Sequence, residues 1–185
     1  MFNKFFIILF IIVSFSLNTF ADEKKLIVDR LININNITFN FEQITNKKKE
    51  TGTCTLVFDN KLICDYEDSM QKRILINKKT LVIQHRRYNK FYFYPISKSP
   101  FIKIFSKNNL INLIKKSDYQ LNNNIEIIHI DKDGRIITIF FKKNNYDLVG
   151  WKVVDQLQNE VYFSIKIKNV NSEINNKIFL IPSVN

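Results

Sequence analysis

The residues that could carry chemistry are few, and the two cysteines are the most informative of them. Cys54 and Cys64 flank the segment TLVFDNKLI, in which two alternating apolar runs meet at Asp59-Asn60, a turn-forming pair. A hairpin around this turn would bring the two thiols close, and in an oxidising compartment they could form a disulfide. The alternatives are two buried free thiols, or a register offset of one residue that places them on opposite faces.

The histidines and the acidic residues do not assemble into a recognisable catalytic or metal site. His85 precedes two arginines and His129 lies within IEIIHID, and neither has a second ligand at metal-binding spacing, so both are interpreted as strand residues. The segment Asp131-Lys132-Asp133-Gly134 begins like a calcium loop but lacks the later Glu and most of the oxygens. We interpret it as a hairpin turn with Gly134 at positive φ. The chain also lacks G-x-S-x-G and Cys/His nucleophile patterns, so we expect no enzymatic activity, no metal and no cofactor.

Length and composition indicate one domain with a full-sized core. The chain has 185 residues, 45% of them hydrophobic, including 17 Phe and 7 Tyr but only 3 Gly and 3 Pro. This composition is too apolar for a disordered protein and too poor in Gly for a P-loop or Rossmann enzyme. The net charge of +11 indicates an anionic partner, either nucleic acid or a membrane surface. The alternative is a Lys-rich surface that is simply solvated.

The first residues resemble a secretory signal peptide. Lys4 is followed by an apolar run from Phe5 to Leu17 and by Thr19-Phe20-Ala21. The rival interpretation, a retained membrane anchor, would need about 20 apolar residues. We therefore expect cleavage after Ala21, which leaves residues 22–185 as one domain. Export also weakens a nucleic-acid role and favours a membrane surface.

The periodicity changes twice along this domain. Apolar residues at helical spacing predict an amphipathic helix over residues 22–35. Ser99-Pro100 then predicts the start of two short helices. Alternating segments surround the second helical region and predict antiparallel strands: ITFNFEQI, TCTLVFDN, KLICDYED, KRILIN, TLVIQHR and KFYFYP before it, and IEIIHI, RIITIFF, YDLVGWKVVD, EVYFSIKI and IFLIP after it.

Together these elements predict an α+β fold, mainly β, built on a single strongly curved or nearly closed antiparallel sheet. Alternate positions on a strand face the same side, so the aromatic and aliphatic stripe lines one interior. That interior is either filled by side chains or hollow enough for an apolar ligand, with the helices covering it. The candidate lining residues are Phe39, Phe41, Leu56, Phe58, Tyr66, Ile76, Ile83, Phe91, Phe93, Phe141, Trp151 and Phe163. The candidate lid residues are Phe101, Ile104, Phe105, Leu110, Leu113 and Ile114.

The order of these segments resembles the LolA family of periplasmic lipoprotein carriers. The resemblance begins with the amphipathic helix followed by FNFEQ and continues through KFYFYPISKSPFIKIF. It extends through LVGWKVVDQLQNEVYFSIKIKNVNSEIN to the ending Phe179-Leu180-Ile181-Pro182. Within the long segment, the positions that resemble the family's pattern are Leu148, Trp151, Asp155, Gln156 and Asn171.

The resemblance implies an incomplete antiparallel β-barrel closed by an α-helical lid. It further implies a periplasmic chaperone that holds the acyl chains of lipoproteins in its cavity and carries them from the inner to the outer membrane. The implied partners are an inner-membrane lipoprotein-releasing ABC transporter and an outer-membrane receptor or an anionic membrane surface. We expect a monomer that binds no nucleic acid. The alternative function is a periplasmic lipid-sensing or regulatory domain on the same fold.

One segment departs from the family's pattern. The family commonly has an Arg-Pro turn at the first hairpin, and that Arg is associated with latching the lid. The corresponding stretch here is Phe58-Asp59-Asn60, without Arg or Pro. Either another residue latches the lid, with Arg86, Arg87 and Lys72 as candidates, or packing alone controls its opening.

Overall fold

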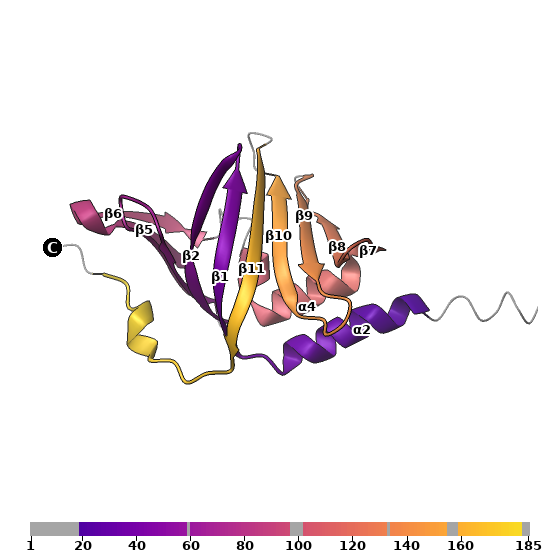
Figure 1. Cartoon of the computed structure of the whole chain (residues 1–185). Coiled ribbons are helices and arrows are strands. Elements are labelled where there is room, and N and C mark those ends of the chain that lie inside the picture. Colours follow the sequence, from indigo (N-terminus) through magenta and orange to yellow (C-terminus); the bar gives the residue numbers. More distant parts are fainter. Residues whose placement is uncertain (1–18, 59, 97–101, 133, 155–158, 183–185) are drawn as a thin grey trace, which may run out of the picture.

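One antiparallel sheet organises the described chain. The computed structural model describes residues 19–58, 60–96, 102–132, 134–154 and 159–182. Within these ranges the sheet has eleven strands in the order β6-β5-β4-β3-β2-β1-β11-β10-β9-β8-β7. It is strongly curved and open, with β6 and β7 as its edges (Figure 1). The predicted incomplete barrel of α+β class, mainly β, is confirmed.

The six strands before the central helices α3 and α4 form one half of the sheet, and the five later strands form the other half, joined to the first by the pairing of β1 with β11. The first six are β1 (Asn36–Thr45), β2 (Lys48–Val57), β3 (Lys61–Tyr66), β4 (Lys72–Asn77), β5 (Thr80–His85) and β6 (Lys90–Pro95). The last five are β7 (Asp118–Leu121), β8 (Ile125–Ile130), β9 (Ile136–Phe141), β10 (Leu148–Val154) and β11 (Glu160–Val170). The helical elements are α2 (Thr19–Ile32), α3 (Ile102–Phe105), α4 (Lys107–Lys116) and the 3₁₀ turns η1 (Arg86–Tyr88) and η3 (Asn176–Phe179).

The first helix begins and ends three residues earlier than predicted. Ile27 and Leu31 lie one above the other at a spacing of four and are buried, as are Val28 beside them and Ile34 just beyond the helix. Ile34 donates its N–H to the Leu31 carbonyl, which closes the last turn before β1. The amphipathic pattern therefore located the buried face correctly, whereas the boundaries shifted, as helix ends commonly do.

The longest-range pairing joins β1 to β11. Ile37 lies opposite Val170 and Thr45 opposite Val161, so segments far apart in the chain become neighbours at the centre of the sheet. Asn171, immediately after β11, fixes the lower end of this ladder. Its Oδ1 accepts the N–H of Asn35 at 2.6 Å, and its Nδ2 donates to the carbonyl of Asn33 at 2.7 Å.

The hairpin of β2 and β3 carries the disulfide. Cys54 lies directly opposite Cys64, and the two are covalently bonded. The turn that joins the strands places Asn60 at φ 57°, a left-handed conformation that Asn tolerates. The prediction that this hairpin brings the cysteines together is confirmed.

Two segments differ from the predicted strands. The C-terminal IFLIP is not a strand, because η3 begins at Asn176 and extends into it as far as Phe179, capped by the Asn175 side chain, which accepts the N–H of Lys177. Phe179 is nevertheless buried, packed on the convex face against Ile63, Leu75 and Val82. The short edge strand β7 was not predicted, because its four residues are polar or exposed except for Tyr119.

Two helices cover the concave face, as the lid prediction requires. Figure 1 shows α4 behind the strands on the concave side, with α2 below it. In α4, Leu110, Leu113 and Ile114 are buried at helical spacing. Phe105, at the end of α3, is also buried. The predicted helix start at Ser99-Pro100 lies outside the described residues, and the described helix begins at Ile102.

We expect the disulfide to contribute substantially to stability. Replacing both Cys54 and Cys64 by Ala should lower the free energy of unfolding by about 2 to 3 kcal/mol, because the unfolded chain regains the freedom of a short closed loop. Urea denaturation measures this loss. A reductant should produce a similar loss in the wild type and leave the double variant unchanged. A wild type insensitive to reductant would contradict the expectation.

Candidate functional site

A cavity of about 370 Å³ lies on the concave face of the sheet. This volume is within the range of about 300 to 1,000 Å³ that is typical of small-molecule sites. The lining comes from seven strands and α3, and nearly all of it is apolar. The lining residues are Phe39, Gln43, Thr45, Cys54, Leu62, Cys64, Tyr66, Lys72, Ile74, Ile76, Leu81, Ile83, Phe105, Trp151, Val161 and Phe163.

The aliphatic wall of the cavity is built by the register of β3, β4 and β5. Side chains directly opposite each other on neighbouring strands point to the same face. Two rows of three therefore run across these strands and face the cavity. The rows are Leu62, Ile76 and Leu81, followed by Cys64, Ile74 and Ile83.

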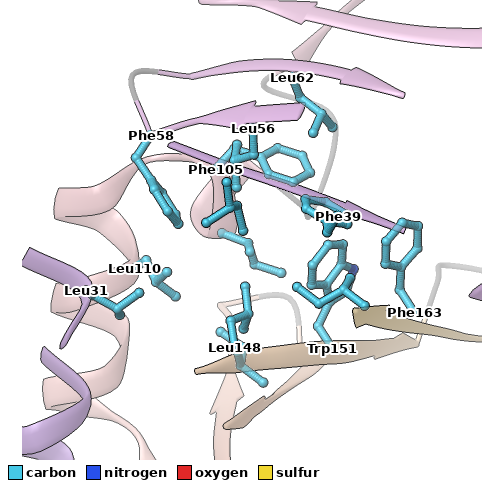
Figure 2. Packing of buried hydrophobic residues seen from close by; sticks show 14 of the residues in the cluster. Leu31, Phe39, Leu56, Phe58, Leu62, Phe105, Leu110, Leu148, Trp151 and Phe163 are labelled. Atoms are coloured by element: carbon cyan, nitrogen blue, oxygen red, sulfur yellow. The ribbon is translucent and has the colours of Figure 1, made fainter. Parts of the chain in front are cut away.

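The opposite wall is aromatic. Trp151 on β10 stacks on Phe163 of β11 with ring centroids 4.4 Å apart and planes inclined by 8°. Phe163 in turn stacks on Phe41 of β1 at 4.8 Å, and Phe41 meets the edge of Tyr66 on β3 at 4.8 Å. Figure 2 shows Trp151 next to Phe39 and Phe163. The aromatic row thus spans the sheet from β10 to β3.

Gly52 on β2 makes this aromatic row continuous. It lies opposite Phe41 on one side and Tyr66 on the other, so a side chain there would stand between the two rings. A Cβ at this position would come within 2.7 Å of the Phe41 ring and 2.1 Å of the Asp65 carbonyl oxygen. The missing side chain therefore lets the Phe41 ring lie over β2 and touch Tyr66.

The predicted cavity residues fall into three groups. Half of them line the cavity: Phe39, Tyr66, Ile76, Ile83, Trp151 and Phe163. Four are buried in the main core cluster without lining the cavity: Phe41, Leu56, Phe58 and Phe141. The interior is therefore part filled and part hollow, and both alternatives drawn from the sequence are partly correct.

The third group, Phe91 and Phe93, does not line the cavity. In the register of β5 and β6, Tyr92 lies opposite Ile83 and shares its concave face, so Phe91 and Phe93 belong to the convex face. Phe91 packs there with the cluster around Phe179, and Phe93 is exposed. The sequence FYFY is aromatic at every position, so alternation alone could not identify which pair faces inward.

Six lining residues were not predicted: Gln43, Thr45, Leu62, Ile74, Leu81 and Val161. Ile74 follows from the Cys54–Cys64 pairing because it lies directly opposite Cys64, and Leu62 follows because residues two apart on one strand share a face. Gln43 and Thr45 share a face with Phe39 for the same reason. These residues were missing from the predicted lining because that list favoured large and mainly aromatic side chains.

One end of the cavity is polar. Tyr66 donates its hydroxyl hydrogen to Gln43 Oε1 at 2.8 Å, and Gln43 Nε2 donates to Thr45 Oγ1 at 3.2 Å. Lys72 Nζ lies 3.7 Å from the centroid of the Tyr66 ring and 2.8 Å from Glu50 Oε1. These residues lie at the end of the sheet that carries the β1–β2 turn, away from α2 (Figure 1).

Charged groups of both signs meet at this end of the cavity. Burial alone would raise the pKa of the Glu50 carboxyl, but hydrogen bonds and the positive charges of Lys72 and Lys48 bring the pKa below its usual value. Glu50 is therefore ionised at neutral pH. Burial, with the negative charges of Glu50 and Asp68, raises the pKa of Tyr66, which stays protonated as a donor. Lys72 in the cavity lining is therefore accompanied by the negative charges of both Glu50 and Asp68.

Among the predicted lid residues, only Phe105 lines the cavity within the described chain. Its ring meets the edge of Trp151 at 6.2 Å. Ile104, Leu110, Leu113 and Ile114 are buried in the main core cluster, and Figure 2 shows Leu110 of α4 beside Leu31 of α2. Phe101 lies outside the described residues.

The lid is held by Lys107, which the sequence did not single out. Its N–H donates to the carbonyl of Phe58 at 3.4 Å. Its Nζ donates to the carbonyl of Ile32 at 3.1 Å and to Asn35 Oδ1 at 3.2 Å. The start of α4 is thus tied to the end of α2 and to the turn where the family's Arg was expected.

The three candidate latch residues contact other elements. Arg86 pairs with Asp65 of β3 at 3.2 Å, and Lys72 pairs with Glu50 of β2. Arg87 Nη1 donates to the carbonyl of Ser69 at 3.3 Å. Their hydrogen bonds and ion pairs therefore join neighbouring strands and turns, and none of them is to α3 or α4 in the described ranges.

The other residues considered for chemistry are two histidines, which lie in strands β5 and β8, and Gly134, which lies between β8 and β9. His85 Nδ1 lies 3.1 Å from the Met70 sulfur, and His129 Nδ1 lies 3.2 Å from the Ser117 hydroxyl. Gly134 has φ 75°, as predicted for the turn. Within the described chain, His, Cys, Asp and Glu side chains form no group of three or more that could hold a metal ion. None of the described helices has the length and apolar character needed to cross a membrane.

Comparison with known proteins gives one family and several structures of the same fold. The sequence model of the family described as outer membrane lipoprotein carrier protein LolA matches residues 33–182. None of the curated proteins matches this chain.

Three solved structures have similar folds at low sequence identity. An uncharacterised conserved protein from Thermus thermophilus has a TM-score of 0.53 and 7% identity, covering 85% of this chain and 93% of its own. MucB has a TM-score of 0.53 and 8% identity, covering 91% of this chain and 64% of its own. A DUF1329 family protein from Desulfovibrio piger has a TM-score of 0.50 and 9% identity, covering 87% of this chain and 97% of its own. At these identities the likeness shows the fold alone.

We expect Gly52→Ala to disturb the aromatic wall. The new methyl group would force apart Phe41 and the Asp65 carbonyl, costing about 1 to 3 kcal/mol of unfolding free energy. Because Phe41 stacks on Phe163, which stacks on Trp151, the fluorescence of this single tryptophan should also change. Gly134→Ala is the control, since a Cβ there meets no atom within 4 Å and adds only backbone strain. Unchanged stability and fluorescence in Gly52→Ala would contradict this account.

Proposed function

Because the chain belongs to the LolA family of outer membrane lipoprotein carriers, we propose that it binds the acyl chains of lipoproteins and carries them between membranes. The transfer runs from the inner to the outer membrane. The observation that carries the proposal is the hollow apolar cavity on the concave face, which Phe105 of α3 helps to close. A filled interior would leave no place for cargo.

The energetics of a lipid anchor make such a cavity necessary. Each buried CH₂ group of an acyl chain contributes about 0.8 kcal/mol to membrane binding, so a lipoprotein with several chains cannot cross water unaided. A lining of Phe, Leu and Ile offers a comparable apolar environment without directional bonds. Cargo of varied protein sequence can then be held through the anchor that all lipoproteins share.

The expected compartment is the periplasm. We propose that residues 1–21 are a signal peptide removed after Ala21, and that residues 22–185 form the mature carrier. The Cys54–Cys64 disulfide supports export, since such bonds persist in oxidising compartments. The proposed partners are an inner-membrane lipoprotein-releasing ABC transporter and, at the outer membrane, a receptor or an anionic lipid surface.

The polar end of the cavity gives the proposed cargo a direction. Lys72, Gln43 and Thr45 offer hydrogen-bond donors at one end, whereas Phe39, Leu62 and Phe105 line the cavity with apolar groups. Hydrocarbon gains most from the apolar part, and ester or carboxylate oxygens gain most from the donors. The acyl chains would therefore enter with their oxygen-bearing ends at Lys72.

Mass spectrometry of the protein purified from its native periplasm tests the carrier role. The expected result is co-purified lipoprotein in near-stoichiometric amounts, together with transfer of that lipoprotein to outer-membrane vesicles. Bound lipid with a stable regulatory partner but no lipoprotein transfer would favour the alternative, a lipid-sensing or regulatory domain. Repeated purification without any acyl lipid would exclude both functions.

A charge placed on the aliphatic wall should abolish lipid binding. Ile83→Asp puts an unpaired carboxylate against the acyl chain, which costs several kcal/mol, so affinity for a fluorescent fatty acid should fall at least tenfold. Ile136→Asp is the matched control, because Ile136 is on strand β9, is 41% exposed and does not line the cavity. Equal affinities for the two variants would contradict the assignment of this wall.

A second prediction concerns direction. Lys72→Met should weaken binding of a fluorescent fatty acid about tenfold, the usual effect of losing one charge-assisted hydrogen bond, and weaken binding of its methyl ester by a smaller factor, because an ester oxygen is a neutral acceptor. Glu50 keeps Lys48 as a partner in this variant. Lys166→Met, an exposed strand position on β11, is the control. An equal loss of affinity for acid and ester would mean that Lys72 acts through packing. No loss of affinity for either ligand would contradict the proposed orientation of the acyl chain.

A further inference from the structure

The net charge of the chain is concentrated in one continuous segment. Residues 69–117 contain twelve Lys and Arg and no Asp or Glu. The rest of the sequence has sixteen basic and seventeen acidic residues and is nearly neutral. The whole positive excess therefore belongs to the segment that forms β4, β5, β6, α3 and α4. An even spread of lysines over a solvated surface does not describe this distribution.

The hairpin of β5 and β6, residues 80–95, adds an unusual density of exposed aromatic rings to this basic segment. Tyr88 is 55% exposed, Tyr92 44%, Phe93 43% and Tyr94 47%. They lie within seven residues of one another on η1 and β6, and β6 is an edge of the sheet. Edge strands usually carry charged side chains that discourage pairing with another chain. A cluster of exposed apolar or aromatic side chains on a protein surface usually marks an interaction site.

The rings project from both faces of the edge strand. Tyr92 and Tyr94 lie on the concave side, opposite Ile83 and Leu81, and Phe93 lies on the convex side, opposite Val82. In Figure 1 this hairpin projects away from α2 and α4 at one side of the sheet. A thin edge with rings on both sides suits insertion into a fluid layer better than seating in a shaped protein groove.

Basic side chains surround these rings. Arg86 and Arg87 lie in η1 and Lys90 begins β6, and the Arg87 guanidinium lies 5.8 Å from the Tyr88 ring centroid. The nearby carboxylates of the β3–β4 hairpin all have partners, and Arg86 of this basic set is one of them. Asp65 accepts from Arg73 and Arg86, Glu67 accepts from Thr51, and Asp68 accepts the N–H of Lys72.

We propose that the β5–β6 hairpin docks the protein on an anionic lipid bilayer. Tyrosine rings favour the headgroup region of membranes, and clustered Lys and Arg favour anionic lipids. The proposal deepens the proposed function, on which it rests, by assigning the surface that meets the membrane. Leu81 and Ile83 of the same hairpin line the cavity, so docking would place the cavity wall beside the bilayer.

Vesicle co-sedimentation of the full mature chain tests this proposal. The wild type should bind vesicles of phosphatidylcholine and phosphatidylglycerol at least tenfold more tightly than vesicles of phosphatidylcholine alone, and 0.5 M salt should remove most of the difference. The triple variant Tyr92→Ser, Phe93→Ser, Tyr94→Ser should lose at least tenfold in affinity for anionic vesicles. The pair Arg87→Gln and Lys90→Gln should lose affinity and flatten the salt dependence without altering the edge strand.

Two controls separate this proposal from the carrier role. Ile130→Ser with Ile136→Ser removes exposed apolar side chains at β8 and β9, and vesicle binding should stay at the wild-type level. Fatty-acid affinity, measured without vesicles, should be unchanged in the Arg87 and Lys90 variant. Absence of fatty-acid binding in the wild type would contradict the carrier role alone.

Three outcomes would overturn the docking surface. They are equal binding of the wild type to neutral and anionic vesicles, wild-type binding by both the aromatic and the basic variants, and dimerisation through β6 in place of vesicle binding. The last is detected as a concentration-dependent dimer in size-exclusion chromatography that the triple variant abolishes.

Discussion

The pairing of β1 with β11 is the interaction on which the rest of the structure depends. It joins the strands that precede α3 and α4 to those that follow them, and its paired residues are between 116 (Thr45 to Val161) and 133 (Ile37 to Val170) positions apart in the sequence. Only when this ladder has formed do Trp151 and Phe163 come beside Phe39, Phe41 and the β2–β3 hairpin. Such long-range closure is entropically costly, and the Asn171 hydrogen bonds to the start of β1 strengthen the point where it begins.

The sheet uses two kinds of side chain for two purposes. Where aromatic rings stack across neighbouring strands, they pack against one another and leave little space between the strands' side chains. Where the smaller Ile and Leu of β3, β4 and β5 face the same interior, space is left over. An empty apolar cavity lowers stability, since its lining lacks contacts on one side. A bound acyl chain would restore those contacts, so cargo binding would offset the loss of stability that the cavity causes in a carrier.

Periodicity located most of this architecture in advance. Alternation identified ten of the eleven strands, and helical spacing identified the buried faces of α2 and α4, because both patterns reflect burial directly. It failed where one residue type fills both faces, as in the FYFY of β6, and where an apolar ending such as IFLIP packs without pairing. The role of Lys107 could not be predicted from the sequence, because its partners Ile32, Asn35 and Phe58 come next to it only in the folded chain.

The disulfide has a consequence for how the cavity is made. Cys54 and Cys64 sit in the cavity wall and meet only when β2 and β3 pair in the correct alignment. A slip of one residue would turn one sulfur toward the opposite face, together with every neighbour on its strand. Oxidation then cannot occur in a misaligned hairpin. The bond therefore locks the one alignment of β2 with β3 that turns Leu62 and Cys64 of β3 toward the cavity, and the rest of the aliphatic wall is then assembled on that strand.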